Sequence, residues 1–466
     1  MADDAGGRPV RTGPRARKRC SRKMLRVTPT APEATPSSLR GHRGQALALV
    51  LAGGLTLPGV LARLSGADLG SVVAPVVFGM AILGSAFLLA WAAEALQLDV
   101  SQGLALTVLA LIAVLPEYAV DFTFAYKAGK NPEKFAPLAL ANMTGGNRLL
   151  IGIGWSLVVL LAAWRMTSIA RKRGYTGELD TDVVLERPHA IEIAFLALAT
   201  AYSLTLPLKR TLTIVDSVIL IGIFVVFVIR ISRAPSTEPH LVGPARLIGS
   251  LPTTQRRVAV GTLLAYAAGV IFLCAEPFAE SLVHLGESAG IDTFLLVQWV
   301  APLASEAPEL LVAALFAWRL NTSAGLGTLI SSKVNQWTLL VGSLPIVFAI
   351  SAGHLSGLPL DSLQREELFL TAAQSVFAIA VLVNRRMSVR EAWMLFGLFI
   401  SQFVLGGILP EHLRELERLG VGTVYLVLAA WIFVEQRVYV KPLVRDGFVV
   451  PADELFHEET PDEARS

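Results

Sequence analysis

The sequence predicts an all-α polytopic membrane protein with about 12 transmembrane helices, and three observations support this fold class. Hydrophobic residues make up 53% of the chain and charged residues 17%, whereas soluble proteins average roughly 25% charged residues. Mostly apolar runs of about 18 residues or more recur along the chain, and each can cross a hydrocarbon core ~30 Å thick. A stretch around residue 117 also returns in weaker form around residue 309, which indicates an internal repeat.

The apolar runs predict where the helices lie. In chain order the expected helices cover about 45–64, 72–97, 100–127, 135–163, 190–208, 212–231, 256–283, 293–319, 322–350, 366–383, 390–409 and 421–437. One extra helix at each end (45–64 and 421–437) leaves two blocks of five helices, 72–231 and 256–409. Because five is odd, the second block would enter the bilayer upside down, which is typical of secondary transporters.

The remaining segments are polar and predict the orientation of the chain. Residues 1–44 hold 11 Lys and Arg against 3 Asp and Glu, so we expect a disordered basic arm that stays cytoplasmic. Residues 232–255 and 438–466 are expected to be a cytoplasmic linker and tail, because most short basic loops fall on the same side. The protein is thus expected in the cell inner (plasma) membrane with both termini cytoplasmic. The partners expected are the lipid bilayer and small inorganic cations, without nucleic acid.

The two copies of the repeat, 109–154 and 297–342, each place a Pro-Glu pair in the middle of an apolar helix. Pro116 and Pro308 lack an N–H, so each frees a backbone carbonyl one turn earlier in the helix. Each proline is followed at once by a carboxylate, Glu117 or Glu309. A free carbonyl beside a carboxylate is the type of oxygen ligand that Na⁺, Ca²⁺ and Mg²⁺ prefer.

Further acids share the helical faces of these glutamates. Asp121 follows Glu117 by four residues, and Glu306 precedes Glu309 by three, so each pair lies on one face. Intramembrane carboxylates are energetically expensive and usually functional, which favours a cation or proton site at mid-membrane. The alternative is a pair of kinked helices whose acids are neutralised by Arg148 and Lys333.

The pattern of Pro-Glu helix followed by a helix containing G-N resembles the calcium/cation antiporter superfamily, of the sodium/calcium exchanger type, with divergent α-repeats. The resemblance implies that Glu117 and Glu309 are the essential cation-binding (metal) glutamates, with Asn142 and Asn147 on the next helix. It also implies a ligand role for Ser305, which stands where the family usually has Thr, next to Glu306 in the place of a Ser. Departures from the family pattern are Ala113-Val114 for a Thr-Ser pair, Gly146 for a serine, and the basic residues Arg148 and Lys333.

Two functional interpretations follow. In the first, the chain is a secondary-active cation antiporter with alternating access, in which Arg148 and Lys333 act as internal counter-ions. Crowded carboxylates disfavour joint ionisation, so we expect proton-coupled exchange, with Na⁺/H⁺ first and Na⁺/Ca²⁺ or Ca²⁺/H⁺ second. In the second, Arg148 and Lys333 neutralise Glu117 and Glu309 in a non-transporting sensor or scaffold. An enzyme is not expected, because the carboxylates lack an accompanying His or nucleophile, and the absence of a P-loop and of a nucleophile elbow argues against ATP-driven transport and hydrolysis. No cofactor is expected; the transported cations would be Na⁺, H⁺ or Ca²⁺.

Overall fold

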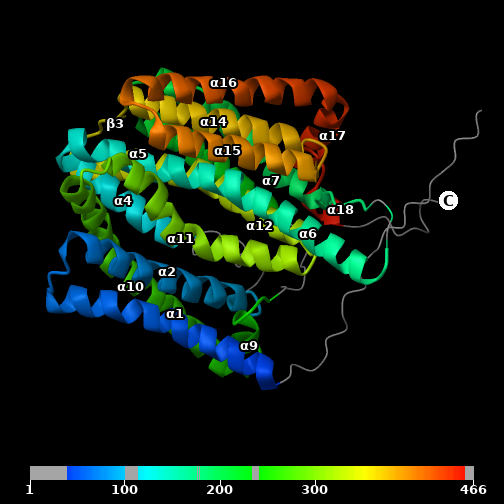
Figure 1. Ribbon diagram of the computed structural model, residues 1–466, viewed down its shortest axis with the longest axis horizontal. Helices are drawn as coiled ribbons and strands as arrows, with labels where there is room; N and C mark the ends of the chain where they lie inside the picture. The colour runs from blue at the N-terminus through cyan, green and yellow to red at the C-terminus, as the bar shows by residue number, and fades with distance from the viewer. Residues whose placement is uncertain (1–38, 100–113, 176, 178, 234–240, 457–466) are drawn as a thin grey trace, which may run out of the picture. The chain divides into compact units, whose positions relative to one another are not determined.

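Helices account for nearly all secondary structure in the computed structural model, in agreement with the predicted fold class (Figure 1). The structure describes residues 39–99, 114–175, 177, 179–233 and 241–456. Most of the basic arm 1–44, and the first part of the helix expected over 100–127, lie outside the described residues. The disorder expected for the arm, and the backbone carbonyl that Pro116 is expected to free, therefore stay predictions.

Most helices follow the expected ranges, but α16 begins ten residues before the expected start at 421, and the helix expected over 135–163 continues to Lys172. The first half of the chain contains α1 (Leu39–Ser65), α2 (Gly70–Leu96), α4 (Leu115–Lys130), α5 (Pro132–Leu149), η1 (Leu150–Trp155), α6 (Ser156–Lys172), η2 (Arg187–His189), α7 (Ala190–Ser203), η3 (Leu206–Leu208) and α8 (Ile214–Ile231). The second half contains α9 (Ala245–Gly249), α10 (Thr253–Ala289), α11 (Thr293–Trp318), α12 (Thr322–Asn335), η4 (Gln336–Leu340), α13 (Val341–Ala352), α14 (Ser362–Leu382), α15 (Val389–Ile408), α16 (Glu411–Glu435), α17 (Arg437–Phe448) and α18 (Ala452–Phe456).

The second helix of each repeat copy has a π-helical segment at its centre. α5 continues through the π-helix η1 into α6, and α12 continues through the π-helix η4 into α13. A π segment widens the helix locally and changes the direction of the side chains that follow it, and such segments are frequent at functional sites. Both copies of the repeat therefore share a local irregularity as well as a sequence pattern.

Side-chain caps determine where several helices begin. At α14, the Asp361 carboxylate accepts from the Gln364 backbone N–H at 2.8 Å, and the Gln364 side chain accepts from the Asp361 N–H at 3.0 Å. Thr213 and Asp216 form the same reciprocal capping box at the start of α8. Each box satisfies two backbone donors that the first turn of a helix leaves without intrahelical partners.

Four two-residue strands connect loops that are far apart in the sequence. β1 (Val183–Val184) pairs antiparallel with β4 (Arg386–Met387), and β2 (Thr211–Leu212) pairs antiparallel with β3 (Leu358–Pro359). In each pair one strand comes from the first block of helices and the other from the second. These contacts hold together the loops at the ends of helices that the sequence separates by more than a hundred residues.

Ten helical segments in the described part of the chain are long and apolar enough to cross a membrane, so the protein is a multi-pass membrane protein. α4 and α14 are not among the ten, and the twelve spans and inverted repeats expected from the sequence stay predictions. The segments expected to be a cytoplasmic linker and tail contain helices: α9 lies in the linker, and most of α17 and all of α18 lie in the tail.

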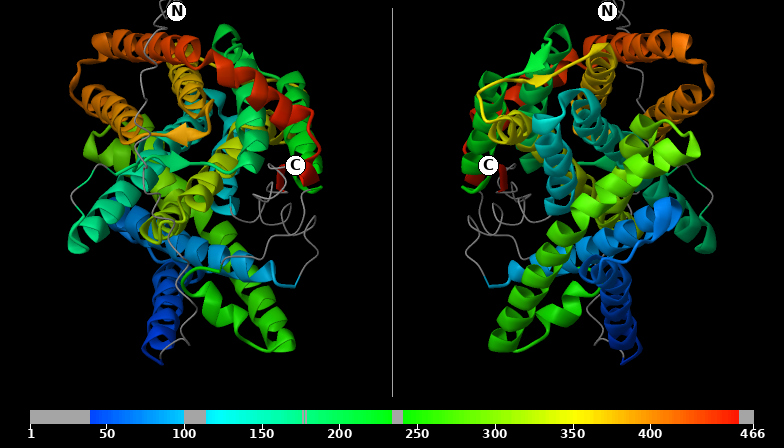
Figure 2. Two further views of the ribbon diagram at one scale, coloured as in Figure 1. Left: turned by 90° about the vertical axis from the view of Figure 1, so that its right-hand side faces the viewer. Right: turned by 90° about the vertical axis from the view of Figure 1, so that its left-hand side faces the viewer.

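The helices of the two repeat copies pack against each other, while α1, α2 and α10 form a bundle beside them. α10 packs against α2 and α1 contacts both, and the three helices lie in the lower half of both views of Figure 2. α4 packs against α5 and α13, whereas α11 packs against α12, α5 and α4. The two Pro-Glu helices, α4 and α11, thus meet in the interior.

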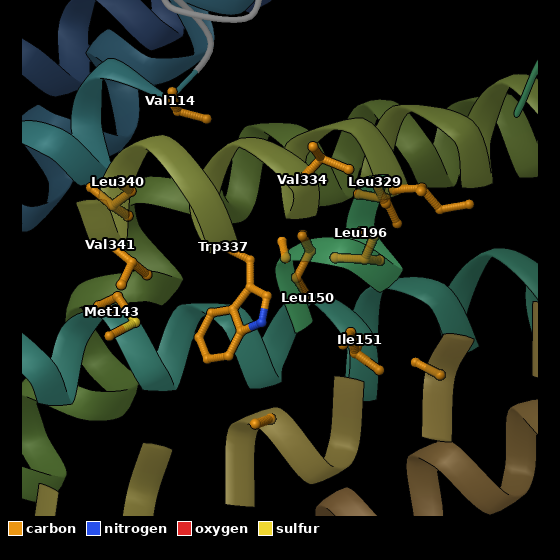
Figure 3. Close-up of a cluster of buried hydrophobic side chains, with 14 of the residues drawn as sticks. Val114, Met143, Leu150, Ile151, Leu196, Leu329, Val334, Trp337, Leu340 and Val341 are labelled. Carbon is orange, nitrogen blue, oxygen red and sulfur yellow. The ribbon is translucent and has the colours of Figure 1, made fainter. Parts of the chain in front are cut away.

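A cluster of buried apolar side chains borders the place where α4, α5, α11 and η4 meet. Figure 3 shows the Trp337 indole of η4 in this cluster, with Leu150 of η1, Val334 of α12, and Met143 and Leu340 nearby. Trp337 and Leu150 are fully buried. Close apolar packing excludes water, so polar groups that face this region must find partners within the protein.

Candidate cation-binding site

A small cavity of about 10 Å³ lies between the two Pro-Glu helices. Its walls combine polar side chains and a few apolar ones: Glu117, Asp121, Asn142, Met143, Gly146, Pro302, Ser305, Glu306, Gln336 and Leu340. The volume is close to the minimum for one water molecule, so one small guest without its hydration shell would fill it.

Four carboxylates converge on this region, two from each Pro-Glu helix. Glu117 and Asp121 lie one turn apart on α4, and Glu306 and Glu309 lie one turn apart on α11; all four are buried. Glu309 does not line the cavity, but it is close enough to Glu117 and Glu306 to act on both electrostatically. Tertiary packing thus brings together the acids of α4 and α11, which are far apart in the sequence.

Only part of the hydrogen-bonding capacity of these acids is satisfied. The Asn142 amide donates to Asp121 Oδ1 at 2.7 Å, and the Gln336 amide donates to Glu306 Oε1 at 3.3 Å. Six buried oxygens in the described region have no hydrogen-bond partner: Glu117 Oε2, Asp121 Oδ2, Glu306 Oε2, Glu309 Oε2, Asn142 Oδ1 and Gln336 Oε1. A buried acceptor without a partner is unfavourable, so a proton or a cation is the guest that these oxygens would stabilise.

The two buried cations do not neutralise Glu117 and Glu309, and the ion pairs of the scaffold interpretation do not occur among the described residues. Arg148 Nη2 instead lies 2.5 Å from Glu367 Oε2 of α14, and its guanidinium stacks 5.1 Å from the ring centre of Trp299. Lys333 Nζ donates to the side-chain oxygen of Asn147 at 2.6 Å and to its backbone oxygen at 3.3 Å. Both side chains are fully buried rather than facing water at a helix end.

Of the remaining expected site residues, Ser305 lies at the cavity and Asn147 lies outside it. Ser305 lines the cavity, although its hydroxyl donates back to the carbonyl of Ala301 at 3.3 Å. Asn147 does not line it: its amide donates to the Met143 carbonyl at 2.8 Å, and its side-chain oxygen accepts from Lys333. Asn147 is therefore the partner of the internal lysine. Of the buried acids, Glu306 lies near enough to Lys333 for direct electrostatic attraction.

Two glycines allow α5 and α11 to approach each other at the site. A Cβ at Gly145 would lie 1.8 Å from the backbone oxygen of Gln298, and a Cβ at Gly146 would lie 2.3 Å from Glu306 Oε1. The Glu306 carboxylate of α11 thus occupies the space beside Gly146 that a side chain at this position would fill.

Sequence reasoning did not include two residues that the structure brings to this region. Gln336 lines the cavity, and Glu367 holds Arg148. Gln336 directly follows Asn335 in an apolar helix, a signal of the same kind as Glu117. Glu367 stands near the start of a long apolar run, where an acid is usually assigned to the interface. Its partner could not be inferred because the two residues are 219 positions apart.

The acids alone do not form a metal-binding cluster. In the parts of the chain that the structure describes, no group of three or more His, Cys, Asp or Glu side chains has the geometry to hold a metal ion. A cation at the cavity would therefore need amide and hydroxyl oxygens, such as those of Asn142, Gln336 and Ser305, beside the carboxylates. Mixed oxygen ligation of this type is usual for Ca²⁺.

Comparisons with known proteins agree with this architecture. The family model described as sodium/calcium exchanger protein matches residues 70–232 and 259–405. The crystal structure of the H⁺/Ca²⁺ exchanger CAX is 39% identical in sequence, with a TM-score of 0.78, over 87% of this chain and 98% of that one. The Ca²⁺/H⁺ antiporter protein YfkE, at 15% identity and a TM-score of 0.57 over 78% of this chain and 100% of that one, shares the fold. A comparison with curated proteins finds no match.

Proposed function

This chain belongs to the sodium/calcium exchanger family, and we propose that it exchanges Ca²⁺ for protons at the cavity between α4 and α11. The family consists of antiporters rather than enzymes, and the chain shares its membrane-embedded helical fold. The observation that carries the proposal is that five residues lining the cavity, on α4, α5, α11 and η4, each have a buried oxygen without a hydrogen-bond partner, with the unpartnered Glu309 Oε2 on α11 as a sixth.

The same oxygens can bind protons or Ca²⁺, but not both at the same time. When the cavity is empty of metal, the four carboxylates cannot all be ionised, because like charges at short range in a dry interior repel strongly. Protons then hold some of them neutral. A divalent cation stabilises the ionised forms and displaces those protons, so the two guests compete for one set of oxygens. Competition of this kind, combined with access from alternate sides, couples the two fluxes.

The choice of cation rests on the comparison with CAX. A monovalent cation was the first expectation from the sequence, because Lys333 adds a positive charge near the acids. At 39% identity over most of both chains, the likeness to an H⁺/Ca²⁺ exchanger now favours Ca²⁺, and Na⁺ becomes the second candidate. Lys333 pairs with Asn147, which leaves Glu117 and Glu309 available to a metal. This arrangement also supports transport over the scaffold interpretation.

The test is ion flux in proteoliposomes. With Ca²⁺ outside and an outward proton gradient, internal dyes should report Ca²⁺ uptake together with proton release. Glu117→Gln and Glu309→Gln should each reduce Ca²⁺ uptake by at least about 100-fold, because each removes a charge from the site (roughly 3 kcal/mol). Glu287→Gln is the matched control, since this exposed acid of α10 pairs with Lys134 at 2.7 Å away from the cavity.

Three outcomes distinguish the alternatives. Ca²⁺ uptake that drives protons and disappears in both glutamate variants supports the proposal. Proton movement driven by Na⁺ but not by Ca²⁺ would move the assignment to Na⁺/H⁺ exchange. The absence of flux under every gradient, in a protein that unfolds cooperatively on heating, would favour the sensor or scaffold.

A further inference from the structure

A second, much larger depression opens between α6 and α15, away from the cation cavity. This groove has a volume of about 700 Å³, and none of its lining residues lines the small cavity. α6 and α15 contact each other, and the Ser156 hydroxyl of α6 donates to the Ala392 carbonyl of α15 at 3.0 Å. The groove runs toward the end of α6 that carries Arg171 and Lys172, the end that the charge pattern of the sequence predicts to be cytoplasmic.

The α6 wall of the groove changes in character along the helix. Its lining residues follow a helical spacing of three or four and share one face: Leu160, Ala163, Trp164, Thr167, Ser168 and Arg171. The first half of this face is apolar, the next turn carries two hydroxyl groups, and the last turn carries a basic residue. At a rise of 1.5 Å per residue, Leu160 and Arg171 lie about 16 Å apart along the helix axis. That length matches the upper part of an acyl chain together with a phosphate headgroup.

Two tryptophans mark the depth of the membrane interface in the groove. Trp164 is 58% exposed and Trp393 of α15 is 56% exposed, and both line the groove. Exposed tryptophans collect where hydrocarbon meets the headgroups, because the ring is apolar and its N–H is polar. The apolar end of the groove therefore faces acyl chains, and its basic end faces headgroups.

The basic residues of the groove are available to a ligand. Neither Arg171 nor Lys172 forms an ion pair with any residue that the structure describes, and both are exposed. The acids near the Thr181 wall are occupied: Asp180 and Asp182 lie 3.0 and 3.5 Å from the Arg386 guanidinium. At the start of α15, the Glu391 carboxylate accepts from the Ser388 hydroxyl and backbone N–H, both at 2.7 Å.

We propose that this groove binds an anionic phospholipid of the leaflet that faces the basic end. Arg171 and Lys172 would hold the phosphate, with Thr167 and Ser168 beside the glycerol oxygens. An acyl chain would lie along Trp164 and Trp393. A free phosphate would leave the apolar half of the groove uncovered, whereas a phospholipid fits both halves. Basic pockets between transmembrane helices are an established way to hold anionic headgroups.

The test uses brominated lipids, which quench tryptophan fluorescence on contact. The full-length protein is reconstituted in phosphatidylcholine vesicles that contain increasing fractions of brominated phosphatidylglycerol or brominated phosphatidylcholine. The signal of Trp164 is the difference between the protein and its Trp164→Phe variant. We expect the anionic lipid to be preferred at Trp164 by about tenfold or more, since each basic residue near a headgroup strengthens binding severalfold.

The matched variants separate a specific site from general surface charge. Arg171→Gln/Lys172→Gln should bring the preference close to one, whereas Arg437→Gln/Lys441→Gln, with the same loss of charge on exposed residues of α17, should leave it unchanged. Salt at 1 M should weaken the preference in the unchanged protein, because screening then acts within about 3 Å. Equal quenching by the two lipids, or a preference that survives loss of Arg171 and Lys172, would overturn the proposal.

Discussion

Arg148 and Lys333, the two buried basic residues of the repeat helices, are held by different partners. Arg148 turns toward α14, where it meets Glu367, and the Gln298 amide donates to the same carboxylate oxygen at 2.9 Å. The Lys333 side chain points toward α5, where the side-chain and backbone oxygens of Asn147 accept hydrogen bonds from it. These contacts assign Arg148 to the packing of α14 against the repeat helices, and Lys333 to the edge of the candidate cation site.

Loss of the Arg148 charge is expected to destabilise the fold. Arg148→Gln leaves the buried Glu367 carboxylate without its ion-pair partner, which should lower the free energy of unfolding by about 3–5 kcal/mol. The measurement is thermal or denaturant unfolding in detergent. Arg148→Gln/Glu367→Gln should recover part of the loss because no charge stays unpaired. An exposed control, Arg390→Gln, should change stability by less than about 0.5 kcal/mol. An Arg148→Gln protein as stable as the control would contradict this assignment.

Loss of the Lys333 charge should instead change the ion dependence. Lys333 lies near Glu306, so Lys333→Gln removes a positive charge that competes with a bound cation. We expect the KM for Ca²⁺ to fall by roughly tenfold, the change that about 1.4 kcal/mol produces. The measurement is Ca²⁺ uptake at a constant pH over a series of Ca²⁺ concentrations. A KM that rises or stays constant, in a stable variant, would mean that Lys333 supports the site rather than competing at it.

At the scale of elements, the site depends on the close approach of α5 and α11. Gly145 allows α5 to lie against the backbone of Gln298, and any side chain there must push the helices apart. Gly145→Ala should therefore lower the free energy of unfolding by about 3 kcal/mol and reduce Ca²⁺ uptake, because overpacking forces the backbone to shift. Flux and unfolding are measured on the same preparations.

A second glycine provides the control for this prediction. Gly53 of α1 has no atom within 4 Å of the place where a Cβ would stand. Gly53→Ala should leave uptake unchanged and stability equal or slightly higher, because alanine favours the helix by up to about 1 kcal/mol. Equal effects of the two substitutions would show that the distance between α5 and α11 is not what matters.

At the scale of the whole molecule, an ion-pair cluster, called here the Asp99 junction, joins the two halves of the chain. Asp99, just after α2, accepts from Arg256 at 2.6 and 2.9 Å and from Arg257 at 3.0 Å, at the start of α10. The hydrogen bonds from Arg256 hold the pKa of Asp99 below its ordinary value. A carboxyl group with a lowered pKa in the folded state stabilises the fold above its unfolded pKa, near 3.9, and loses this contribution as the pH falls through the folded pKa.

The pH dependence of stability should reveal this junction. At pH 7, Asp99→Asn should lower the unfolding temperature by roughly 1–3 °C. The difference between the protein and the variant should shrink progressively below about pH 4, because the protein itself then becomes protonated at Asp99. Thermal unfolding in detergent between pH 7 and pH 3 measures both. A difference that stays constant down to pH 3 would indicate that the charge of Asp99 does not contribute.

Local patterns determined most of the fold from the sequence alone. The apolar runs predicted the membrane class and the described helices to within a few residues for most elements, because helix length and hydrophobicity are local properties. Spacing also placed Glu117 with Asp121, and Glu306 with Glu309, since residues three or four apart share a helical face. Family membership followed from these same residues and the helices that carry them.

Only the tertiary structure decided which side chains meet across helices. Nothing near Arg148 in the sequence points to Glu367, and nothing near Asn147 distinguishes a cation ligand from a partner of Lys333. Gln336, the first residue of the π-helix η4, lines the cavity, and the sequence pattern did not predict this π-helical segment. Helical periodicity specifies faces, whereas the pairing of faces depends on close packing of the whole bundle, to which distant residues contribute.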